Sequence, residues 1–279
     1  MNPEEKILET WQRQTDRVSA DVFNRYFRDG NTRRLTSLRR LDAAFEKVMR
    51  EIRETEVGDV PAVWSVYNMG VVVKTRESLF SIDLHHRRAV ELAPLLDFAL
   101  ITHNHDDHWR QDFYRAMDRA HKTVVSNFLD NYGAADWRKG GSDWHRDGGF
   151  RAGEATLRVR DVEIRTSLVD HNDYLIDFTT AFEIRVGNWT LYHTGDCGKG
   201  SEGKLRVSNP DLWVFFPGCG INVEEAVRRV RPKHLAFGHL WELGHKSGRL
   251  TAPLLRNAFA AARRAGAEPV LALWGDRLI

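Results

Sequence analysis

Residues 100–109 read LITHNHDDHW and hold three histidines and two aspartates within six consecutive positions. The apolar run immediately before the motif is typical of a buried strand. Successive side chains of an extended or tightly turned segment point in alternating directions, so His103 and His105 can converge on one centre. Asp107 and His108 follow where the turn begins and can face a second centre. Imidazole and carboxylate together suit a divalent ion such as zinc, manganese or iron.

The two adjacent aspartates also have a simpler interpretation. Asp106 and Asp107 would suit the N-terminus of the helix predicted to follow, because negative charge is stabilised there. That interpretation leaves three closely spaced histidines unexplained. The HxHxDH pattern therefore predicts metal binding.

One such motif cannot complete two metal centres, so further ligands are expected elsewhere in the chain. His171, Asp196 and His239 each come just after a predicted strand. Loops at strand ends carry functional side chains on a rigid scaffold. These three residues are the candidates for the remaining ligands.

The first 56 residues differ in pattern from the rest. Two apolar stripes at helical spacing occupy residues 7–27 and 35–52, and Gly30 between them is a candidate helix C-cap. The sequence therefore predicts a helical hairpin over residues 1–56. Its large apolar face is expected to pack on the remaining domain or on another subunit, as in a homo-oligomer.

Residues 57–279 read as short strands separated by turns, with helices between some of them. Two hairpins are expected to turn at residues 160–161 and 187–188. Residues 127–149 show no clear period and are interpreted as an irregular insertion. The pattern predicts an α+β domain.

The ordered series of HxHxDH, a lone His, GD and a strand-terminal His resembles the metallo-β-lactamase-fold hydrolases over about residues 60–279. The segments TLYHTGDCG and PDLWVFFPG are similar to the branch that contains ascorbate-6-phosphate lactonase. The resemblance implies an αββα sandwich, in which two mixed sheets are flanked by helices. Here the N-terminal helical hairpin would be an addition to that fold.

The resemblance also implies a site for two divalent ions, with zinc expected first and manganese or iron as alternatives. Asp83 would support this site from the first strands. The implied first ligand set is His103, His105 and His171, and the second is Asp107, His108 and His239, with Asp196 bridging the two ions.

The chain departs from that branch at several positions. Asn68 stands where the branch usually has a histidine, and Leu84 follows Asp83 where a proline is usual. Cys197 follows Asp196 where threonine is common. These differences leave the ligand set intact and bear on the substrate.

The expected activity is metal-dependent hydrolysis of a small anionic ester, either a lactone or a phosphodiester, by a water shared between the ions. Asp107, Asp196 and His245 are the predicted catalytic residues. Lys199, Lys204 and Lys246 are candidate contacts for a phosphate group. The alternatives are a nuclease or phosphodiesterase acting on nucleic acid, and a metal-binding module without catalysis. Oxygen reduction at a di-iron centre is a further alternative, although it normally needs a partner flavin domain.

Composition restricts the partners. The chain has 41 basic and 39 acidic residues, a formal net charge of +2, which predicts no broad basic surface for nucleic acid. No apolar run reaches the roughly 20 residues that cross a bilayer, and the N-terminus does not read as a signal peptide. The only two cysteines, Cys197 and Cys219, are expected to be free thiols, with a redox pair or a thiolate ligand as alternatives. A cytoplasmic enzyme acting on a small molecule is expected.

Overall fold

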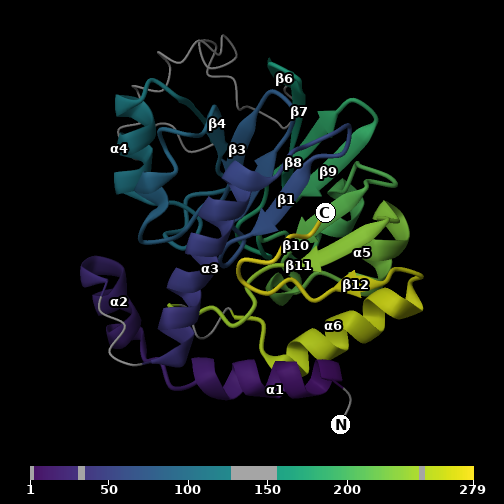
Figure 1. Cartoon of the computed structure of the whole chain (residues 1–279). Helices are drawn as coiled ribbons and strands as arrows, with labels where there is room; N and C mark the ends of the chain where they lie inside the picture. The colour runs from purple at the N-terminus through teal and green to yellow at the C-terminus, as the bar shows by residue number, and fades with distance from the viewer. Residues whose placement is uncertain (1–2, 31–34, 127–155, 245–248) are drawn as a thin grey trace.

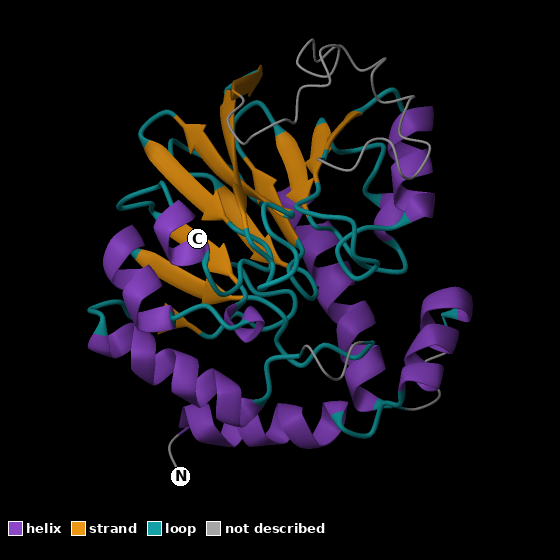
Figure 2. Ribbon diagram, turned by 180° about the vertical axis from the view of Figure 1, so that it is seen from behind, coloured by secondary structure: helices purple, strands orange, loops and turns teal. Residues whose placement is uncertain are grey.

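The computed structural model describes residues 3–30, 35–126, 156–244 and 249–279. Two β-sheets form the centre, with α3 and α4 beside the first sheet and α5 and α6 beside the second (Figure 1, Figure 2). The helices are α1 (Pro3–Thr15), α2 (Ala20–Asp29), α3 (Thr36–Glu54), α4 (Gln111–Arg119), α5 (Val223–Val230) and α6 (Ala252–Arg264). The predicted insertion at 127–149 lies outside the described residues. None of the helices described combines the length and the apolar character that a membrane span requires.

The first sheet has five strands in the order β1-β2-β3-β4-β5. β1 to β3 pair antiparallel, and β3, β4 and β5 pair parallel. In register, Phe80 of β3 pairs with Phe98 of β4, and their rings stack at 4.6 Å. The strands are β1 (Ala62–Ser65), β2 (Val71–Lys74), β3 (Leu79–Ile82), β4 (Phe98–Leu100) and β5 (Thr123–Val125).

The second sheet has seven strands in the order β12-β11-β10-β9-β8-β7-β6. β6 to β9 form an antiparallel meander, and β9 to β12 are parallel. Because β7 and β9 are both antiparallel to β8, the carboxyl ends of β7, β9 and β11 lie at the same edge. The strands are β6 (Thr156–Val159), β7 (Val162–Val169), β8 (Thr179–Val186), β9 (Trp189–His193), β10 (Leu212–Phe215), β11 (His234–Phe237) and β12 (Pro269–Val270).

The N-terminal region contains three helices where the sequence predicted two. The apolar stripe of residues 7–27 is divided because α1 ends at Thr15, whose hydroxyl donates back to the carbonyl of Trp11 at 3.0 Å. Ser19 then caps α2 by accepting a hydrogen bond from the Val22 backbone at 3.3 Å. Gly30, at φ 69°, ends α2 as expected.

These helices pack against the rest of this chain. Trp11 of α1 stacks on Trp241 at 5.1 Å and meets Trp274 edge-on at 4.9 Å. Phe23 of α2 lies 5.8 Å from the Tyr67 ring. Buried side chains of α1 to α3 and of both sheets therefore form one continuous hydrophobic core. The apolar face predicted from the sequence is covered within the protomer, and the homo-oligomer stays a prediction.

The end of the chain differs from the predicted strand PVLALW. Only Pro269 and Val270 pair with β11, because the following residues cross to the first sheet. There the Gly275 N–H donates to the carbonyl of Ser65 at 2.8 Å and the Leu278 N–H to that of Val63 at 2.7 Å. The last residues thus extend the first sheet beside β1.

Candidate metal centre

Asp83, just after β3, holds the start of the histidine loop. The Thr102 backbone donates to Asp83 Oδ1 at 2.8 Å, and the Thr102 hydroxyl donates to Oδ2 at 2.7 Å. The same Oδ2 lies 2.9 Å from His108 Nδ1. A carboxylate on one ring nitrogen orients the other nitrogen toward a metal. Asp83 therefore occupies the supporting position that the resemblance implied.

The first group of candidate ligands comprises His103, His105 and His171, whose ring nitrogens lie within 4.8 Å of one another. His103 Nε2 is 3.1 Å from His105 Nδ1. His171 Nε2 is buried and has no hydrogen-bond partner among the described residues. Burial lowers the pKa of all three imidazoles, which keeps them in the neutral form that binds metals.

The second group comprises Asp107, His108 and His239. His239 Nε2 lies 3.3 Å from His108 Nε2, and the His239 ring stacks on Phe216 at 4.1 Å. His239 has φ 54°, in the left-handed region that only a few non-glycine residues adopt. Such strained residues cluster at functional sites.

Asp196 joins the two groups. Its Oδ1 lies 2.9 Å from His239 Nε2 and 3.3 Å from His108 Nε2, while its Oδ2 lies 3.6 Å from His171 Nε2. Burial alone would raise the pKa of Asp196, but the His239 and His108 imidazoles hold it well below its usual range. The Asp196 carboxylate is therefore ionised. Its Oδ1 faces the second group and its Oδ2 faces the first.

The donor set fits two divalent cations. All seven predicted ligands come together at one end of the sandwich, from the loops after β4, β7, β9 and β11. The two groups are adjacent and share Asp196. Mixed imidazole and carboxylate donors suit zinc, manganese or iron.

The same geometry predicts proton release when a metal binds. Burial lowers the pKa of His239, but the adjacent Asp196 carboxylate outweighs this and raises it to about 9. His108 is raised well above its usual range, also mainly by Asp196. The His239 ring therefore carries its second proton at pH 7 in the metal-free protein, and ligation must displace that proton. We expect zinc binding to release at least one proton, and the apparent affinity to rise as the pH increases toward about 9.

Calorimetry of zinc binding in buffers of different ionisation enthalpy measures this release. The variant His234→Gln, altered at an exposed position, is the control and should release as many protons as wild type. Identical heats in all buffers at pH 7 would contradict the assignment of a second proton to His239.

Two further residues orient the ligands and were missed as functional residues by sequence reasoning. The Asn68 amide donates to the Asp107 backbone carbonyl at 3.0 Å and to Asp107 Oδ2 at 3.1 Å. Glu242 is buried, and its Oε2 lies 3.4 Å from His239 Nδ1. The sequence offers two signals for these residues: Glu242 comes three residues after His239, and Asn68 stands where the resembled branch usually has a histidine.

The two cysteines occupy different environments, and both are free thiols. Cys219 borders the first group, with Sγ 3.9 Å from His171 Nδ1 and 4.0 Å from Asp196 Oδ2. Cys197 is fully buried beside the Thr194 hydroxyl, and burial raises the pKa of its thiol to about 12. No disulfide joins them.

Two of the three lysines expected to contact phosphate are already paired. Lys199 forms an ion pair with Asp173 at 3.0 Å. Lys204 contacts both Asp170 and Asp177 at 2.6 Å. The remaining candidates at residues 245 and 246, His245 and Lys246, lie outside the described residues.

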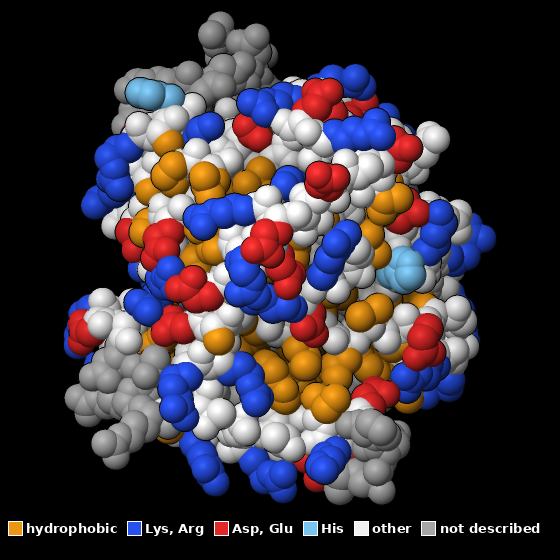
Figure 3. Space-filling view, in the orientation of Figure 1, with side chains coloured by type: hydrophobic (Ala, Val, Ile, Leu, Met, Phe, Trp, Pro, Cys, Tyr) orange, Lys and Arg blue, Asp and Glu red, His pale blue; other side chains and the backbone are white. Residues whose placement is uncertain are grey.

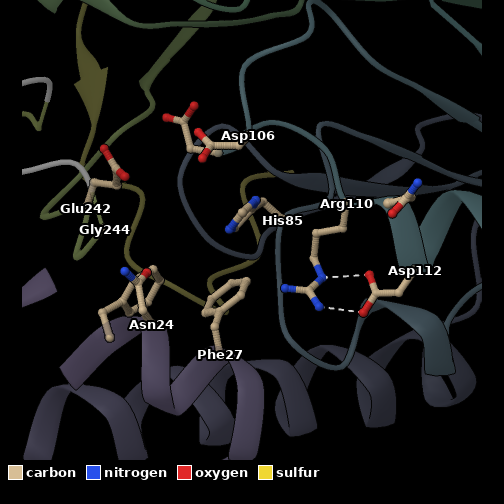
Figure 4. A pocket seen from close by; sticks show the side chains of 11 residues that line it. Asn24, Phe27, His85, Asp106, Arg110, Asp112, Glu242 and Gly244 are labelled. Carbon is tan, nitrogen blue, oxygen red and sulfur yellow. Dashed lines mark hydrogen bonds and ion pairs between the residues drawn. The ribbon is translucent and has the colours of Figure 1, made fainter. Parts of the chain in front are cut away.

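A cavity of about 650 Å³ opens beside the second group (Figure 4). Asp107 and Glu242 line it on the side of the ligands, and Phe27 of α2 lines it opposite. His85, which no sequence pattern singled out, also lines this cavity, and burial lowers its pKa to about 3. An N-terminal helix therefore forms part of the wall next to the candidate metal centre.

Comparisons with known proteins establish the fold. No profile of a known protein family matches the chain, and no curated protein sequence does. Among solved structures, it is similar to a metallohydrolase from Ignicoccus hospitalis, with 17% identity, TM-score 0.54, and 78% of this chain and 97% of that chain covered. It is also similar to a metallo-β-lactamase-fold protein from Bacillus subtilis, with 15% identity, TM-score 0.54, and 78% of this chain and 98% of that chain covered.

A diiron β-hydroxylase from Streptomyces venezuelae is similar as well, with 16% identity and TM-score 0.53 over 78% of this chain. The chain spans about half of that enzyme, 54% of its length. Together these likenesses show that the chain has the metallo-β-lactamase fold, as predicted. The narrower resemblance to the ascorbate-6-phosphate lactonase branch stays a prediction.

Proposed function

We propose that the protein is a metal-dependent hydrolase that cleaves a small ester, and that a lactone or another carboxylic ester is a better substrate than a phosphodiester. The observation that carries this proposal is the pair of ligand groups sharing Asp196 beside an open cavity. Divalent ions bound there would supply an ionisable water and polarise the attacked oxygen. Zinc is the first expectation, with manganese or iron as alternatives.

The chain's own residues prepare the site for this chemistry. Asp83 and Glu242 orient His108 and His239 through their Nδ1 atoms, which leaves Nε2 of both rings directed at Asp196. Asn68 holds the Asp107 carboxylate toward the second group. Fixing ligands in this way reduces the reorganisation that the reaction requires.

Charge favours a carboxylic ester over a phosphodiester. Recognition of a phosphate group calls for fixed cations or aimed N–H donors. Lys199 and Lys204 are both paired with aspartates, and the exposed Asp106 carboxylate in the cavity lining has no cation partner among the described residues. An uncharged ester avoids the repulsion that a phosphodiester would meet there.

Nucleic acid is the less favoured substrate. On the face shown in Figure 3, lysine and arginine side chains are interspersed with aspartate and glutamate over the part of the chain that is described. A strand that contacts several phosphates needs a continuous basic surface. The mixed surface and the net charge of +2 argue for a small substrate.

A substrate panel tests the proposal. The purified protein, after its metal content is measured, is given phenyl acetate, γ-butyrolactone, bis-p-nitrophenyl phosphate and a labelled oligonucleotide. We expect hydrolysis of the carboxylic esters, loss of activity after a chelator, and recovery with added zinc or manganese. Preferential cleavage of the oligonucleotide would support a nuclease instead. Stoichiometric metal without turnover of any substrate would support a non-catalytic metal-binding module.

A further inference from the structure

The cavity beside the candidate metal centre has two unlike walls (Figure 4). One wall is acidic and carries Asp106, Asp107 and Glu242. The other wall is a row of rings: Phe23 lies 4.6 Å from Phe27, and Phe27 stacks on His85 at 4.6 Å. Flat apolar groups pack well on such a row of ring faces.

Arg110 is the one cation in the described part of the lining, and it is already neutralised. Arg110 binds Asp112 through two hydrogen bonds, from Nε to Oδ1 at 2.8 Å and from Nη2 to Oδ2, and its guanidinium lies 4.8 Å over the Phe27 ring. Asp106 is exposed, and no cation pairs with it among the described residues. Among the described lining residues, the Asp106 carboxylate is therefore the side-chain charge left without an opposite charge.

His85 contributes the face of a neutral ring to the apolar wall. The residue is 8% exposed, and its Nδ1 has no hydrogen-bond partner within the described ranges. This nitrogen has almost no accessible surface, so a group in the cavity would contact the face of the His85 ring rather than its Nδ1.

We propose that this cavity binds the flat, apolar part of the substrate, that this part carries no negative charge, and that α2 thereby sets the specificity. The proposal rests on the proposed function for the ester bond itself. The cavity adjoins Asp107, so a group seated on Phe27 would lie beside the second ligand group. A carboxylate or phosphate in the same place would face Asp106 without a free cation among the described residues.

Three esters of similar shape test the charge preference: the acetates of 3-tert-butylphenol, 3-(trimethylammonio)phenol and 3-hydroxybenzoate. Each kcat/KM is divided by the rate of spontaneous hydrolysis, which corrects for leaving-group reactivity. We expect the carboxylate ester to be poorer than the tert-butyl ester by roughly tenfold, and the trimethylammonio ester to be at least as good as the tert-butyl ester. A preference for the carboxylate ester overturns the proposal. If that preference then disappears in the variant Lys246→Ala, anion binding is assigned to Lys246.

The role of α2 is tested by two neighbouring substitutions. Asn24 lines the cavity and is exposed, so Asn24→Trp should narrow the cavity without disturbing the core. Arg25 is also exposed and does not line it, so Arg25→Trp is the matched control. We expect Asn24→Trp to lower the ratio of kcat/KM for the tert-butylphenyl ester to that for methyl acetate by about tenfold. Equal ratios in the two variants overturn the assignment of α2.

Binding of the three parent phenols to the metal-loaded protein, measured by calorimetry, separates this proposal from the proposed function. The tert-butyl phenol should bind more tightly than 3-hydroxybenzoate, and Asn24→Trp should weaken it, even if no ester is hydrolysed. That outcome would retain the cavity and reject the hydrolase. Hydrolysis of esters without this ranking of phenols would retain the hydrolase and reject the cavity.

Discussion

Replacing Asp196 with alanine is expected to empty both metal positions and abolish hydrolysis. The two oxygens of this carboxylate face different ligand groups, at 2.9 Å from His239 Nε2 and 3.6 Å from His171 Nε2. A shared carboxylate also offsets the repulsion between two cations. Loss of a residue that only orients a ligand weakens metal binding about 10–100-fold, so loss of the bridge should exceed roughly 100-fold.

Metal content of the purified protein, measured by inductively coupled plasma mass spectrometry, provides the readout. Asp173→Ala is the matched control, because this exposed carboxylate pairs with Lys199 in the neighbouring loop and contacts neither group. His171→Ala should mainly reduce occupancy of the first position, and His239→Ala that of the second. Two ions per chain in Asp196→Ala would refute the bridging role.

The positions of the candidate ligands were predictable because the signal for them is local. HxHxDH follows an apolar strand directly, and His171, Asp196 and His239 each follow another strand end. Parallel strands bring their carboxyl ends to one edge of a sheet, so order along the chain translates into proximity. The structure brings all of these residues together.

The residues that orient the ligands were not predictable in the same way. Asn68 reaches Asp107 across 39 positions of sequence, and its role depends on the pairing of two loops. His85 lines the cavity only because α2 packs over it. Asn68 drew notice in the sequence only as a departure from the resembled branch, and His85 drew none, so the tertiary contacts are what show their positions at the site.

The ion pairs of the surface lysines could not be predicted from the sequence either. Lys204 looked like a cation on a glycine-containing loop, but two aspartates from the loop after β7 neutralise it. The division between α1 and α2 has a similar cause, since the Thr15 and Ser19 side chains compete with the helix for backbone hydrogen bonds. Both features follow from side-chain hydrogen bonding that apolar periodicity does not record.

Truncating the N-terminal helices is expected to destroy the native fold. Deleting residues 1–56 would expose the Trp241 and Trp274 rings on which Trp11 packs, and would remove the α2 wall of the cavity. We expect the truncated chain to aggregate or to change its oligomeric state. A monomeric truncation that keeps its stability and activity would contradict this, and would mean that the helices are an independent addition.

The substitution Trp11→Ala measures how much α1 contributes to the free energy of unfolding. Trp11 is 7% exposed and lies between two other tryptophans, so its removal leaves a large cavity and should lower the free energy of unfolding by about 3–5 kcal/mol. Ile7→Ala, on the same helix but 38% exposed, should change it by no more than about 0.5 kcal/mol. Urea unfolding of both variants at a fixed metal concentration measures the difference. Equal midpoints would show that α1 contributes little to stability, whereas a selective loss in Trp11→Ala would show that the helix belongs to the core that supports the candidate metal centre.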